Sequence, residues 1–560
     1  MKTYIDEYQR WCQLAIDDPE IVAELKKING DEKLIEDAFY RDLAFGTGGL
    51  RGVLGAGTNR MNIYTVRKAS QGLANYLNNH FQKPSIAISY DSRINSTLFA
   101  EAAAGVFAAN GIKVFIYKQL MPTPLVSYAV RELKCSAGIM VTASHNPSKY
   151  NGYKVYGSDG CQIANEVADE TLDNINKLDI FKDVKYIDFK EALKNGSVEY
   201  ISDDIYTKFI ERVKKESVLQ DEKLDKNVKI IYSPLNGTGL KPVTRILKEC
   251  GYQNVIVVKE QEQPDGHFPT CPYPNPEIRE AMALGIEYAK REQADLLIAT
   301  DPDCDRVGIA VKNSSGEYVL LSGNQTGILL LDFICQMRKK HAKMPQNPVF
   351  VKTIVTSDMT KKVADKYGVK CVDVLTGFKY IGEQIRLLEE QNREQDYILG
   401  FEESYGYLSG SYVRDKDAVD GVFLIVEMFV YYKTNGISLL DKLEELYKEF
   451  GYYCNYLNSF EFEGSQGATK MAEVVDFFRN KVDAIAGLKV NKKFDYNKGI
   501  DGLPKSNVIK MFLEDGSTIV VRPSGTEPKL KLYISICGPS VKDNDTKYQK
   551  FQECLKEYIK

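Results

Sequence analysis

The apolar run Ala137-Gly-Ile-Met-Val141 stops abruptly at Thr-Ala-Ser144-His145-Asn146-Pro147. This pattern predicts a buried strand that ends at Val141. Pro147 cannot donate a hydrogen bond to a sheet, and Asn146 before it disfavours a helix, so Ser144 is expected on a loop. In open α/β sheets, ligands bind at loops that follow the carboxyl ends of strands.

The residues before this loop alternate between strand-like and helix-like patterns. Apolar strand-like runs at 85–90 and 112–117 alternate with helical periodicity over 96–110 and 123–133. Together with the strand at 137–141 they make a βαβαβ series. This series predicts a parallel sheet with helices on its faces.

Two similar series follow, and the end of the chain differs from them. Strands are predicted at 228–232, 254–259 and 294–300, and again at 348–355, 369–376 and 397–402, with helices between them that include 275–292. Near the end, strand-like pieces at 508–513, 518–522 and 529–536 surround one helix near 466–482. The predicted fold class is α/β, with three similar mixed or parallel α/β units followed by a C-terminal α+β domain.

Four domains are predicted from these series. A helical arm over residues 1–45 is counted with the first unit, and the ranges are 1–205, 206–320, 321–450 and 451–560. A chain of 560 residues exceeds what one hydrophobic core supports, so several domains are expected.

Composition and charge exclude several classes of protein. The chain is 44% hydrophobic and 27% charged, and its net charge of −4 provides no basic surface for nucleic acid. The 11 cysteines form no C-x-x-C pair, which favours reduced thiols over disulfides or a zinc site. The N-terminus lacks an apolar signal core, and the longest apolar stretch, near 421–432, is interrupted by Glu427. A cytoplasmic protein without a membrane or nucleic-acid partner is predicted.

A second motif, Thr300-Asp301-Pro-Asp303-Cys-Asp305-Arg306, follows the strand predicted at 294–300. Alternate carboxylates on an extended loop can converge on a hard cation, and without a cation they would repel each other. An EF-hand is excluded because its glycine and glutamate positions are Arg306 and Lys312 here. An all-oxygen set of few ligands suits Mg²⁺, and an acidic solvated turn is the alternative.

A glycine-rich stretch, Phe45-Gly-Thr-Gly-Gly-Leu-Arg51-Gly52, precedes the first α/β series. Its backbone amides and the Arg51 guanidinium can face an anion. A dinucleotide-binding motif is excluded because Arg51 stands where the last glycine is needed. A flexible turn is the alternative.

Two more polar motifs lie in the third unit. Gly400-Phe-Glu402-Glu-Ser404 ends a predicted strand and offers acceptors for sugar hydroxyls, although a plain acidic loop has the same composition. Lys416 lies in the charged stretch 413–417 and can transfer protons if it is desolvated, whereas an exposed charge run is the alternative.

The remaining candidates are a phosphate cradle and a nucleophile. The stretch Arg522-Pro-Ser-Gly-Thr-Glu-Pro528 separates two predicted strands, and its guanidinium, hydroxyls and loop N–H groups can hold a phosphate. Ser144 is a nucleophile candidate because His145 and Lys154 lie close to it in sequence, although Ser-His alone is a common dipeptide.

In this order, Thr-Ala-Ser-His-Asn-Pro, Asp-Pro-Asp-x-Asp-Arg, Gly-x-Glu-Glu-Ser and Arg-Pro-Ser-Gly-Thr-Glu-Pro resemble the four signatures of the α-D-phosphohexomutase superfamily. The resemblance implies four domains around a central cleft, which carry in turn a phosphoserine loop, a metal-binding loop, a sugar-recognition loop and a phosphate-binding loop. By resemblance, Ser144 carries the phosphoryl group and holds Mg²⁺ together with Asp301, Asp303 and Asp305. The implied substrate-binding residues are Arg306, Gly377, Phe378, Lys379, Glu402, Ser404, Lys531 and, for the non-reacting phosphate, Arg522, Ser524, Gly525 and Thr526. Lys416, Arg51, His145 and Lys154 match groups that transfer protons or stabilise charge in the family.

Within the superfamily, the N-terminal arm, the chain length and Gly-Phe-Glu-Glu-Ser-Tyr-Gly-Tyr resemble the phosphoglucomutase/phosphopentomutase branch. This resemblance implies interconversion of glucose 1-phosphate and glucose 6-phosphate through phosphoserine and a bound glucose 1,6-bisphosphate. Phosphopentomutase and phosphomannomutase activities are the alternatives. The implied partners are small sugar phosphates, and the implied state is a monomer or weak dimer.

Two more distant alternatives use the same residues differently. A haloacid-dehalogenase-type phosphotransferase would use Asp301 as its nucleophile, but Asp305 stands where that class has threonine or valine. A non-catalytic paralogue would bind sugar phosphates without turning them over, although all four motifs are intact in the sequence.

Overall fold

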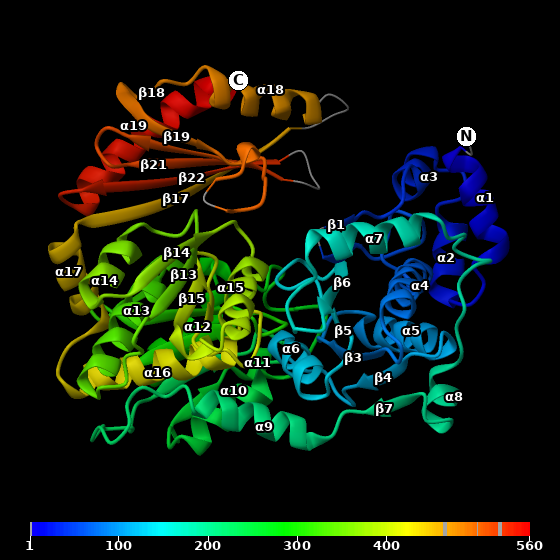
Figure 1. Ribbon diagram of the computed structural model, residues 1–560, viewed down its shortest axis with the longest axis horizontal. Helices are drawn as coiled ribbons and strands as arrows, with labels where there is room; N and C mark the ends of the chain where they lie inside the picture. Colours follow the sequence, from blue (N-terminus) through cyan, green and yellow to red (C-terminus); the bar gives the residue numbers. More distant parts are fainter. Residues whose placement is uncertain (1–2, 47, 463–466, 501, 525–528, 560) are drawn as a thin grey trace.

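The computed structural model consists of four structural units (Figure 1). The structure describes residues 3–46, 48–462, 467–500, 502–524 and 529–559. The N-terminal unit (blue to cyan in Figure 1) lies opposite the C-terminal one (orange to red), and two central units connect them. The predicted fold class is confirmed, and no helix in the described ranges has the length and apolar character needed to cross a membrane.

The N-terminal arm consists of three short helices, α1 (Tyr4–Leu14), α2 (Pro19–Lys27) and α3 (Glu32–Phe39). Side chains cap each of them: Thr3 and Asp6 form a capping box, and Asp18 and Asp31 accept backbone N–H bonds at the next two helices. Trp11 is fully buried and packs edge-on against aromatic rings of the arm and of the first unit. The arm is therefore part of the first core.

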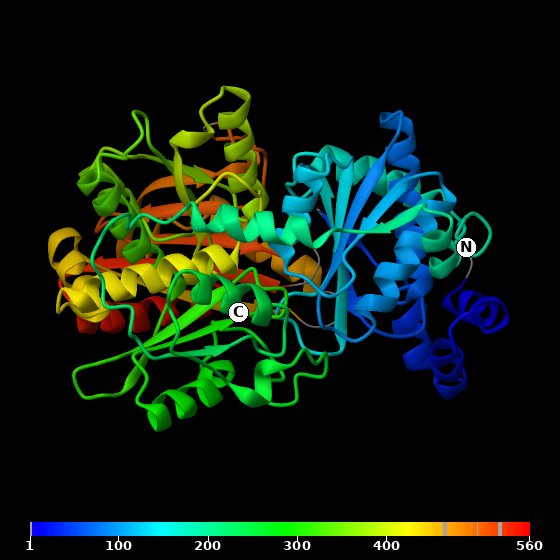
Figure 2. The same cartoon turned by 90° about the horizontal axis from the view of Figure 1, so that it is seen from below.

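The first unit has a seven-stranded sheet in the order β1-β2-β6-β5-β3-β4-β7, with helices on both faces (Figure 2). Its elements are β1 (Phe45–Gly46), β2 (Gly49–Val53), α4 (Ile63–His80), β3 (Ser85–Tyr90), α5 (Ser96–Ala109), β4 (Lys113–Ile116), α6 (Thr123–Glu132), β5 (Ala137–Val141), β6 (Tyr150–Gly157), α7 (Asn165–Asn176), α8 (Phe189–Lys194) and β7 (Val198–Tyr200). The predicted βαβαβ series forms the parallel part, β4-β3-β5.

The sheet is mixed because the chain turns back after the Ser144 loop. β6 runs antiparallel to β5 and then pairs with β2, so that Arg51 lies opposite Gly152. Gly49 permits this pairing, since a Cβ there would lie 1.8 Å from the carbonyl oxygen of Tyr153. Arg51 and Lys154 thus stand on neighbouring strands.

The second unit contains a five-stranded sheet in the order β12-β11-β10-β8-β9. Helix α9 (Asp203–Lys214) leads into it, and its elements are β8 (Ile230–Ser233), α10 (Leu240–Glu249), β9 (Val255–Val257), α11 (Lys259–Glu262), α12 (Arg279–Glu292), β10 (Leu296–Thr300), β11 (Val307–Lys312) and β12 (Tyr318–Leu321). The helix predicted from residue 275 begins only at Arg279. The Asn275 side chain accepts the Glu277 N–H (3.1 Å) in a turn, which takes Glu277 out of the helix.

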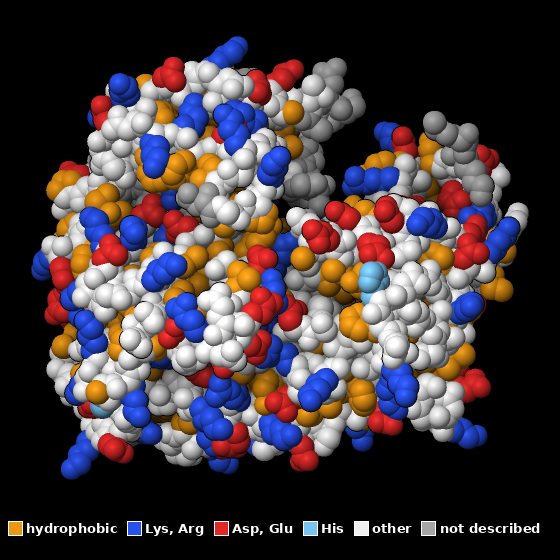
Figure 3. Space-filling model, in the orientation of Figure 1, with side chains coloured by type: hydrophobic (Ala, Val, Ile, Leu, Met, Phe, Trp, Pro, Cys, Tyr) orange, Lys and Arg blue, Asp and Glu red, His pale blue; other side chains and the backbone are white. Residues whose placement is uncertain are grey.

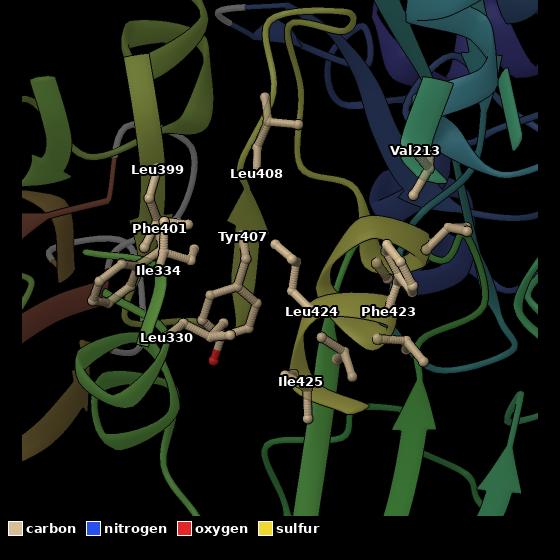
Figure 4. Packing of buried hydrophobic residues seen from close by; sticks show 14 of the residues in the cluster. Val213, Leu330, Ile334, Leu399, Phe401, Tyr407, Leu408, Phe423, Leu424 and Ile425 are labelled. Carbon is tan, nitrogen blue, oxygen red and sulfur yellow. The ribbon is translucent and has the colours of Figure 1, made fainter. Parts of the chain in front are cut away.

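The third unit has a four-stranded sheet, β14-β13-β15-β16, covered by long helices. Its elements are α13 (Gly323–Lys340), β13 (Val349–Thr353), α14 (Met359–Tyr367), β14 (Lys370–Val374), α15 (Phe378–Glu390), the 3₁₀ turn η1 (Glu394–Asp396), β15 (Tyr397–Glu402), β16 (Gly406–Leu408), α16 (Ala418–Thr434) and α17 (Leu439–Phe450). In its core, Leu330 and Ile334 of α13 meet Phe401, and Leu424 lies across from Tyr407 (Figure 4).

The C-terminal unit is an antiparallel six-stranded sheet, β17-β22-β21-β20-β19-β18. Its elements are β17 (Tyr452–Glu461), α18 (Gly467–Asn480), β18 (Ala484–Ile485), β19 (Leu488–Asp495), the 3₁₀ turn η2 (Tyr496–Lys498), β20 (Ile509–Leu513), β21 (Thr518–Pro523), β22 (Lys529–Gly538) and α19 (Val541–Ile559). The prediction of a single helix in this unit is wrong. The described residues contain α18 and α19, and both pack on the same sheet.

Glu427, which interrupts the apolar stretch of α16, joins the second and third units. Its carboxylate accepts the Ser217 hydroxyl (2.5 Å) and the Val218 N–H (3.3 Å). Burial raises the pKa of Glu427 to about 7, and these hydrogen bonds and Lys226 only partly oppose this shift.

We expect this carboxyl to make the folded protein less stable as pH rises. The folded state keeps the proton up to about pH 7, whereas the unfolded chain loses it near the ordinary pKa of 4.5. Stability is therefore lost between these values, by on the order of 3 kcal/mol. Thermal unfolding of wild type and Glu427→Gln at about pH 5 and pH 8 tests this: the variant should gain stability over wild type only at pH 8. An equal difference at both pH values would contradict it.

Candidate active site

One cavity of about 700 Å³ is lined by residues of all four units. Figure 3 shows the molecule hollowed between the N-terminal unit at the right and the C-terminal unit at the upper left. Three lining loops follow the carboxyl ends of β5, β10 and β15, as expected for α/β sheets. Of the predicted site residues, the following line the cavity: Arg51, Ser144, His145, Lys154, Asp305, Arg306, Gly377, Phe378, Glu402, Ser404, Lys416, Arg522 and Lys531.

Ser144 lies immediately beyond β5 in a left-handed backbone conformation with φ of 52°. Such a conformation is rare for a serine and is typical of functional loops. The Ser144 N–H donates to Thr142 Oγ1 (2.8 Å), and its hydroxyl donates to Asp301 Oδ2 (2.9 Å). The loop therefore presents the hydroxyl to the aspartate cluster of the second unit.

His145 is a second group beside this hydroxyl, with Nδ1 at 3.2 Å from Ser144 Oγ. Burial, followed by the positive charges of Arg306 and Arg51, keeps the pKa of His145 well below its ordinary value. The imidazole is therefore neutral at pH 7 and can accept a proton.

Asp301, Asp303 and Asp305 are buried after β10, and one carboxylate oxygen from each lies within 4.8 Å of the others. Asp301 Oδ1 accepts the N–H groups of Asp305 and Arg306, which shapes the loop. Burial and the two neighbouring carboxylates raise the pKa of Asp301 well above its ordinary value. Burial also raises the pKa of Asp303, but the Lys154 ammonium outweighs this effect and lowers it overall.

The donor set of this cluster fits a hard divalent cation. Asp303 Oδ1 and Asp305 Oδ1 are buried and have no hydrogen-bond partner in the part of the chain that the structure describes. Lys154 contacts the other oxygens of these two residues at 2.9 and 3.3 Å. Buried carboxylate oxygens need a positive partner, and oxygen ligands of this kind suit Mg²⁺.

Lys416 is the second ammonium beside the cluster. Its Nζ lies 3.3 Å from Asp305 Oδ2 and 3.2 Å from Asp415 Oδ1. Burial lowers the pKa of Lys416, but Asp305, Asp415 and Glu402 outweigh it and raise the pKa overall. All of 413–417 is buried, so the alternative of an exposed charge run is wrong.

The sugar-recognition loop predicted after β15 also faces the cavity. Glu402 Oε1 accepts the Gly377 N–H (3.0 Å), which joins two of the predicted substrate-binding stretches. Burial raises the pKa of Glu402, and the nearby Lys416 and Arg306 partly oppose this effect. Glu403 also lines the cavity, and its carboxylate accepts hydrogen bonds from Thr353 and Thr356.

Two cations stand at the C-terminal side of the cavity. Arg522 of β21 lies directly opposite Lys531 of β22 in the antiparallel register. Burial and then the Arg522 charge lower the pKa of Lys531. Like charges across a strand pair are unfavourable unless an anion lies between them, which suits a phosphate.

Several predicted residues are placed differently or lie outside the described residues. Lys379 does not line the described cavity, and its ammonium donates to Asn165 Oδ1 (2.9 Å) at the boundary with the first unit. Ser524 also lies outside the cavity lining, and its backbone N–H donates to the carbonyl oxygen of Lys529 (2.7 Å). Gly525 and Thr526 fall outside the described residues.

The structure adds residues that the motif analysis did not select. Glu277 lines the cavity and forms an ion pair with Arg306 (2.6 Å). Thr123, at the start of α6, donates from its hydroxyl to Asp303 Oδ2 (2.8 Å). For Glu277, the sequence signal was the Asn-Pro pair before it, which is typical of a turn rather than of a helix interior.

Comparison with known proteins identifies the family. Models described as phosphoglucomutase/phosphomannomutase alpha/beta/alpha domains I, II and III match residues 42–180, 206–316 and 322–450, and the C-terminal domain model matches 470–541. The phosphoglucomutase of Staphylococcus saprophyticus is 38% identical over 510 residues, which cover 88% of this chain and 90% of that protein. The chain belongs to the phosphoglucomutase/phosphomannomutase family. A phosphoglucomutase of Staphylococcus aureus is also 38% identical, over 525 residues that cover 90% of this chain and 92% of that protein.

Solved structures share the fold of this family member. Parafusin, a phosphoglucomutase from Paramecium in an open form, superposes with a TM-score of 0.68 at 18% identity, covering 92% of this chain and 96% of that one. A phosphoglucomutase/phosphomannomutase family protein from Burkholderia thailandensis gives a TM-score of 0.67 at 18% identity, covering 92% and 97%.

Family membership confirms the predicted α-D-phosphohexomutase resemblance. The protein is a phosphosugar mutase, an isomerase that acts by intramolecular phosphotransfer. The haloacid-dehalogenase alternative is therefore wrong. The buried aspartate cluster agrees with the predicted metal requirement.

Proposed function

We propose that this mutase interconverts glucose 1-phosphate and glucose 6-phosphate, with Ser144 as the residue that carries the phosphoryl group. The observation that carries this proposal is that Ser144, whose Oγ contacts Asp301 (2.9 Å), lines the same cavity as Arg522 and Lys531. A reactive serine and a separate phosphate-holding pair are what a phosphosugar mutase needs. The relatives named phosphoglucomutase support glucose as the sugar.

The proposed reaction begins with phosphorylated Ser144. A free hydroxyl of the sugar phosphate attacks the phosphorus atom, the Ser144 Oγ–P bond breaks, and a sugar 1,6-bisphosphate forms. The proton lost by the sugar hydroxyl ends on Ser144 Oγ. Lys416 is the proposed proton-transfer group on the sugar side, and neutral His145, whose Nδ1 lies 3.2 Å from Ser144 Oγ, can pass this proton to Oγ once it has accepted it.

Charge neutralisation is the main catalytic requirement of this scheme, because two phosphate groups meet in one cavity. Lys154 and Arg306 are proposed to act at the Ser144 side, and Arg522 and Lys531 at the other. Asp301, Asp303 and Asp305 would hold Mg²⁺, which supplies positive charge to phosphoryl oxygens when it is bound. Arg51 is a further cation in reach of the loop, with its guanidinium 3.5 Å from Asn146 Oδ1.

The bisphosphate intermediate must reverse its orientation in the cavity. Its original phosphate then faces Ser144 and returns to it, while the newly added phosphate takes the place beside Arg522. Glucose 1,6-bisphosphate is therefore proposed both as the intermediate and as the activator that phosphorylates Ser144. Glu402, Ser404, Gly377 and Phe378 would contact the sugar in both orientations.

Rates on three sugar phosphates test the proposed substrate. With magnesium and a trace of the matching bisphosphate, we expect kcat/KM for glucose 1-phosphate to exceed that for ribose 1-phosphate and mannose 1-phosphate by about tenfold or more, since correct hydroxyl contacts are worth at least that factor. A preference for ribose 1-phosphate would assign phosphopentomutase activity instead. No turnover of any of the three would favour the non-catalytic alternative.

We further propose that the enzyme acts in the cytoplasm as a monomer or weak dimer. All 11 cysteines are free thiols, which supports a reducing compartment. Size-exclusion chromatography with light scattering tests the oligomeric state, and a tight dimer at nanomolar concentration would contradict it.

A further inference from the structure

Arg93, just beyond β3, is a buried cation that contacts the Ser144 loop. Its side chain is 0% exposed. One terminal nitrogen donates to the carbonyl oxygens of Pro147 and Tyr150, both at 3.0 Å, and the other donates to those of Ser144 and Asn146. All four terminal N–H bonds of the guanidinium are therefore used on one loop.

A second chain of hydrogen bonds fixes the other side of Ser144. Asp91, two residues before Arg93, accepts the Thr142 hydroxyl (2.6 Å) and the Arg93 N–H (3.0 Å). Thr142 Oγ1 in turn accepts the Ser144 N–H (2.8 Å). Arg93 thus holds the Ser144 carbonyl directly, and Asp91 supports the Ser144 N–H through Thr142. The left-handed backbone conformation of Ser144 costs of order 1–3 kcal/mol and persists only with such support.

The second unit completes this arrangement. The Phe268 ring centroid lies 5.1 Å from the Arg93 guanidinium carbon, and Phe268 is 1% exposed. Gly266 allows the loop at 263–269 to come this close, because a Cβ there would lie 2.4 Å from the backbone nitrogen of Ile94. A buried guanidinium that stacks on an aromatic face and donates to four acceptors has little freedom to move.

We infer that Arg93 is a positioning residue of the phosphoryl transfer, clamped by Phe268 of the neighbouring unit. The inference rests on the proposed role of Ser144. Among the described residues, no hydrogen bond or ion pair joins Arg93 to the aspartate cluster, although the charges of Asp301 and Asp303 act on it, so its direct contacts are with the loop backbone. It holds Ser144 at the position where its oxygen meets Asp301, and it engages four carbonyl oxygens that would otherwise be free to approach the phosphoryl dianion.

A lysine cannot replace this residue, because its ammonium has three N–H bonds at one point and lacks the planar fork that spans four acceptors. We expect Arg93→Lys to fold and to lower kcat by about 100-fold, the cost of a displacement of about 1 Å at a reacting atom. KM for glucose 1-phosphate should stay within about twofold, because the proposed substrate contacts belong to other loops.

The experiment compares wild type, Arg93→Lys, Arg93→Ala and the matched control Arg131→Lys, whose guanidinium instead contacts Glu389 and the carbonyl of Asp159. Melting temperature, kcat, KM and the rate of phosphate release to water from the phosphoenzyme are measured for each. Of these four proteins, only the two Arg93 variants should lose kcat and release more phosphate to water per turnover. Methylguanidinium should restore part of the kcat of Arg93→Ala. Phe268→Leu, which removes the ring from the Arg93 guanidinium, should also lower kcat, by about tenfold.

An Arg93→Lys enzyme with unchanged kcat, or one in which KM rises while kcat is unchanged, overturns the inference. If the Arg93 variants do not fold, an unchanged kcat in Phe268→Leu overturns it instead. Wild-type inactivity, by contrast, would refute the proposed function itself. If wild type is active, Ser144→Ala is inactive and the Arg93 variants are fully active, only the positioning role of Arg93 is refuted.

Discussion

Ser144→Ala is expected to lower the mutase kcat by at least about 10⁴-fold, which is the scale of loss when a covalent nucleophile is removed. Without the hydroxyl, no phosphoryl group can be stored between the two half-reactions. The remaining hydrogen bonds of the loop do not depend on this oxygen, since the Ser144 N–H and carbonyl are held by Thr142 and Arg93. The variant should therefore fold and melt within a few degrees of wild type.

Activity is measured by a coupled assay from glucose 1-phosphate, and phosphoenzyme is measured by mass spectrometry after incubation with glucose 1,6-bisphosphate. Ser148→Ala is the matched control, because it makes the same change on the same loop in a residue outside the cavity lining. Wild type and this control should each gain one phosphoryl group at Ser144, and Ser144→Ala should gain none. Turnover by Ser144→Ala above about 1% of wild type would reject the proposed scheme.

Asp303→Asn is expected to weaken Mg²⁺ binding by about 100-fold or more and to lower kcat on a similar scale. Loss of a residue that only hydrogen-bonds to a metal ligand lowers metal affinity or activity by up to about 100-fold. Asp303→Asn removes a negative charge from the cluster itself. Asp303 is fully buried, and its unpaired Oδ1 belongs to the donor set that fits a cation.

Titration calorimetry with magnesium chloride measures binding without reference to activity. Asp203→Asn, an exposed position in α9, is the matched control and should behave as wild type. Removal of divalent cations from wild type should abolish turnover, and added magnesium should restore it. Wild-type affinity for magnesium in Asp303→Asn would show that the cluster is not the metal site.

Sequence patterns located the candidate active site because its loops follow regular elements. The predicted strands at 137–141 and 397–402 coincide with β5 and β15, and β10 ends at Thr300 as expected. Each apolar run stops where the backbone leaves the core, so the polar residues that follow had to lie at a sheet edge. Ser144 and the aspartates were therefore selected for a local physical reason.

Other features depend on contacts that local patterns do not show. β6 was not predicted, because its residues form a strand by pairing with β5 and β2 rather than by apolar alternation. Lys379 was expected at the substrate, but it faces Asn165 of the first unit. Glu277 was assigned to a helix, and a side-chain turn places it beside Arg306 instead.

The sequence by itself determined the kinds of chemical groups and their local supports: a serine after a strand, three alternating carboxylates, and cations near both ends of the chain. These follow from short-range rules of strand ending, turn formation and charge repulsion. The tertiary structure alone decided which groups meet, because residues 157 positions apart, such as Ser144 and Asp301, come within 2.9 Å only when separate sheets pack together. It also revealed Arg93, since a buried cation is identified by the acceptors around it and not by its neighbours in the chain.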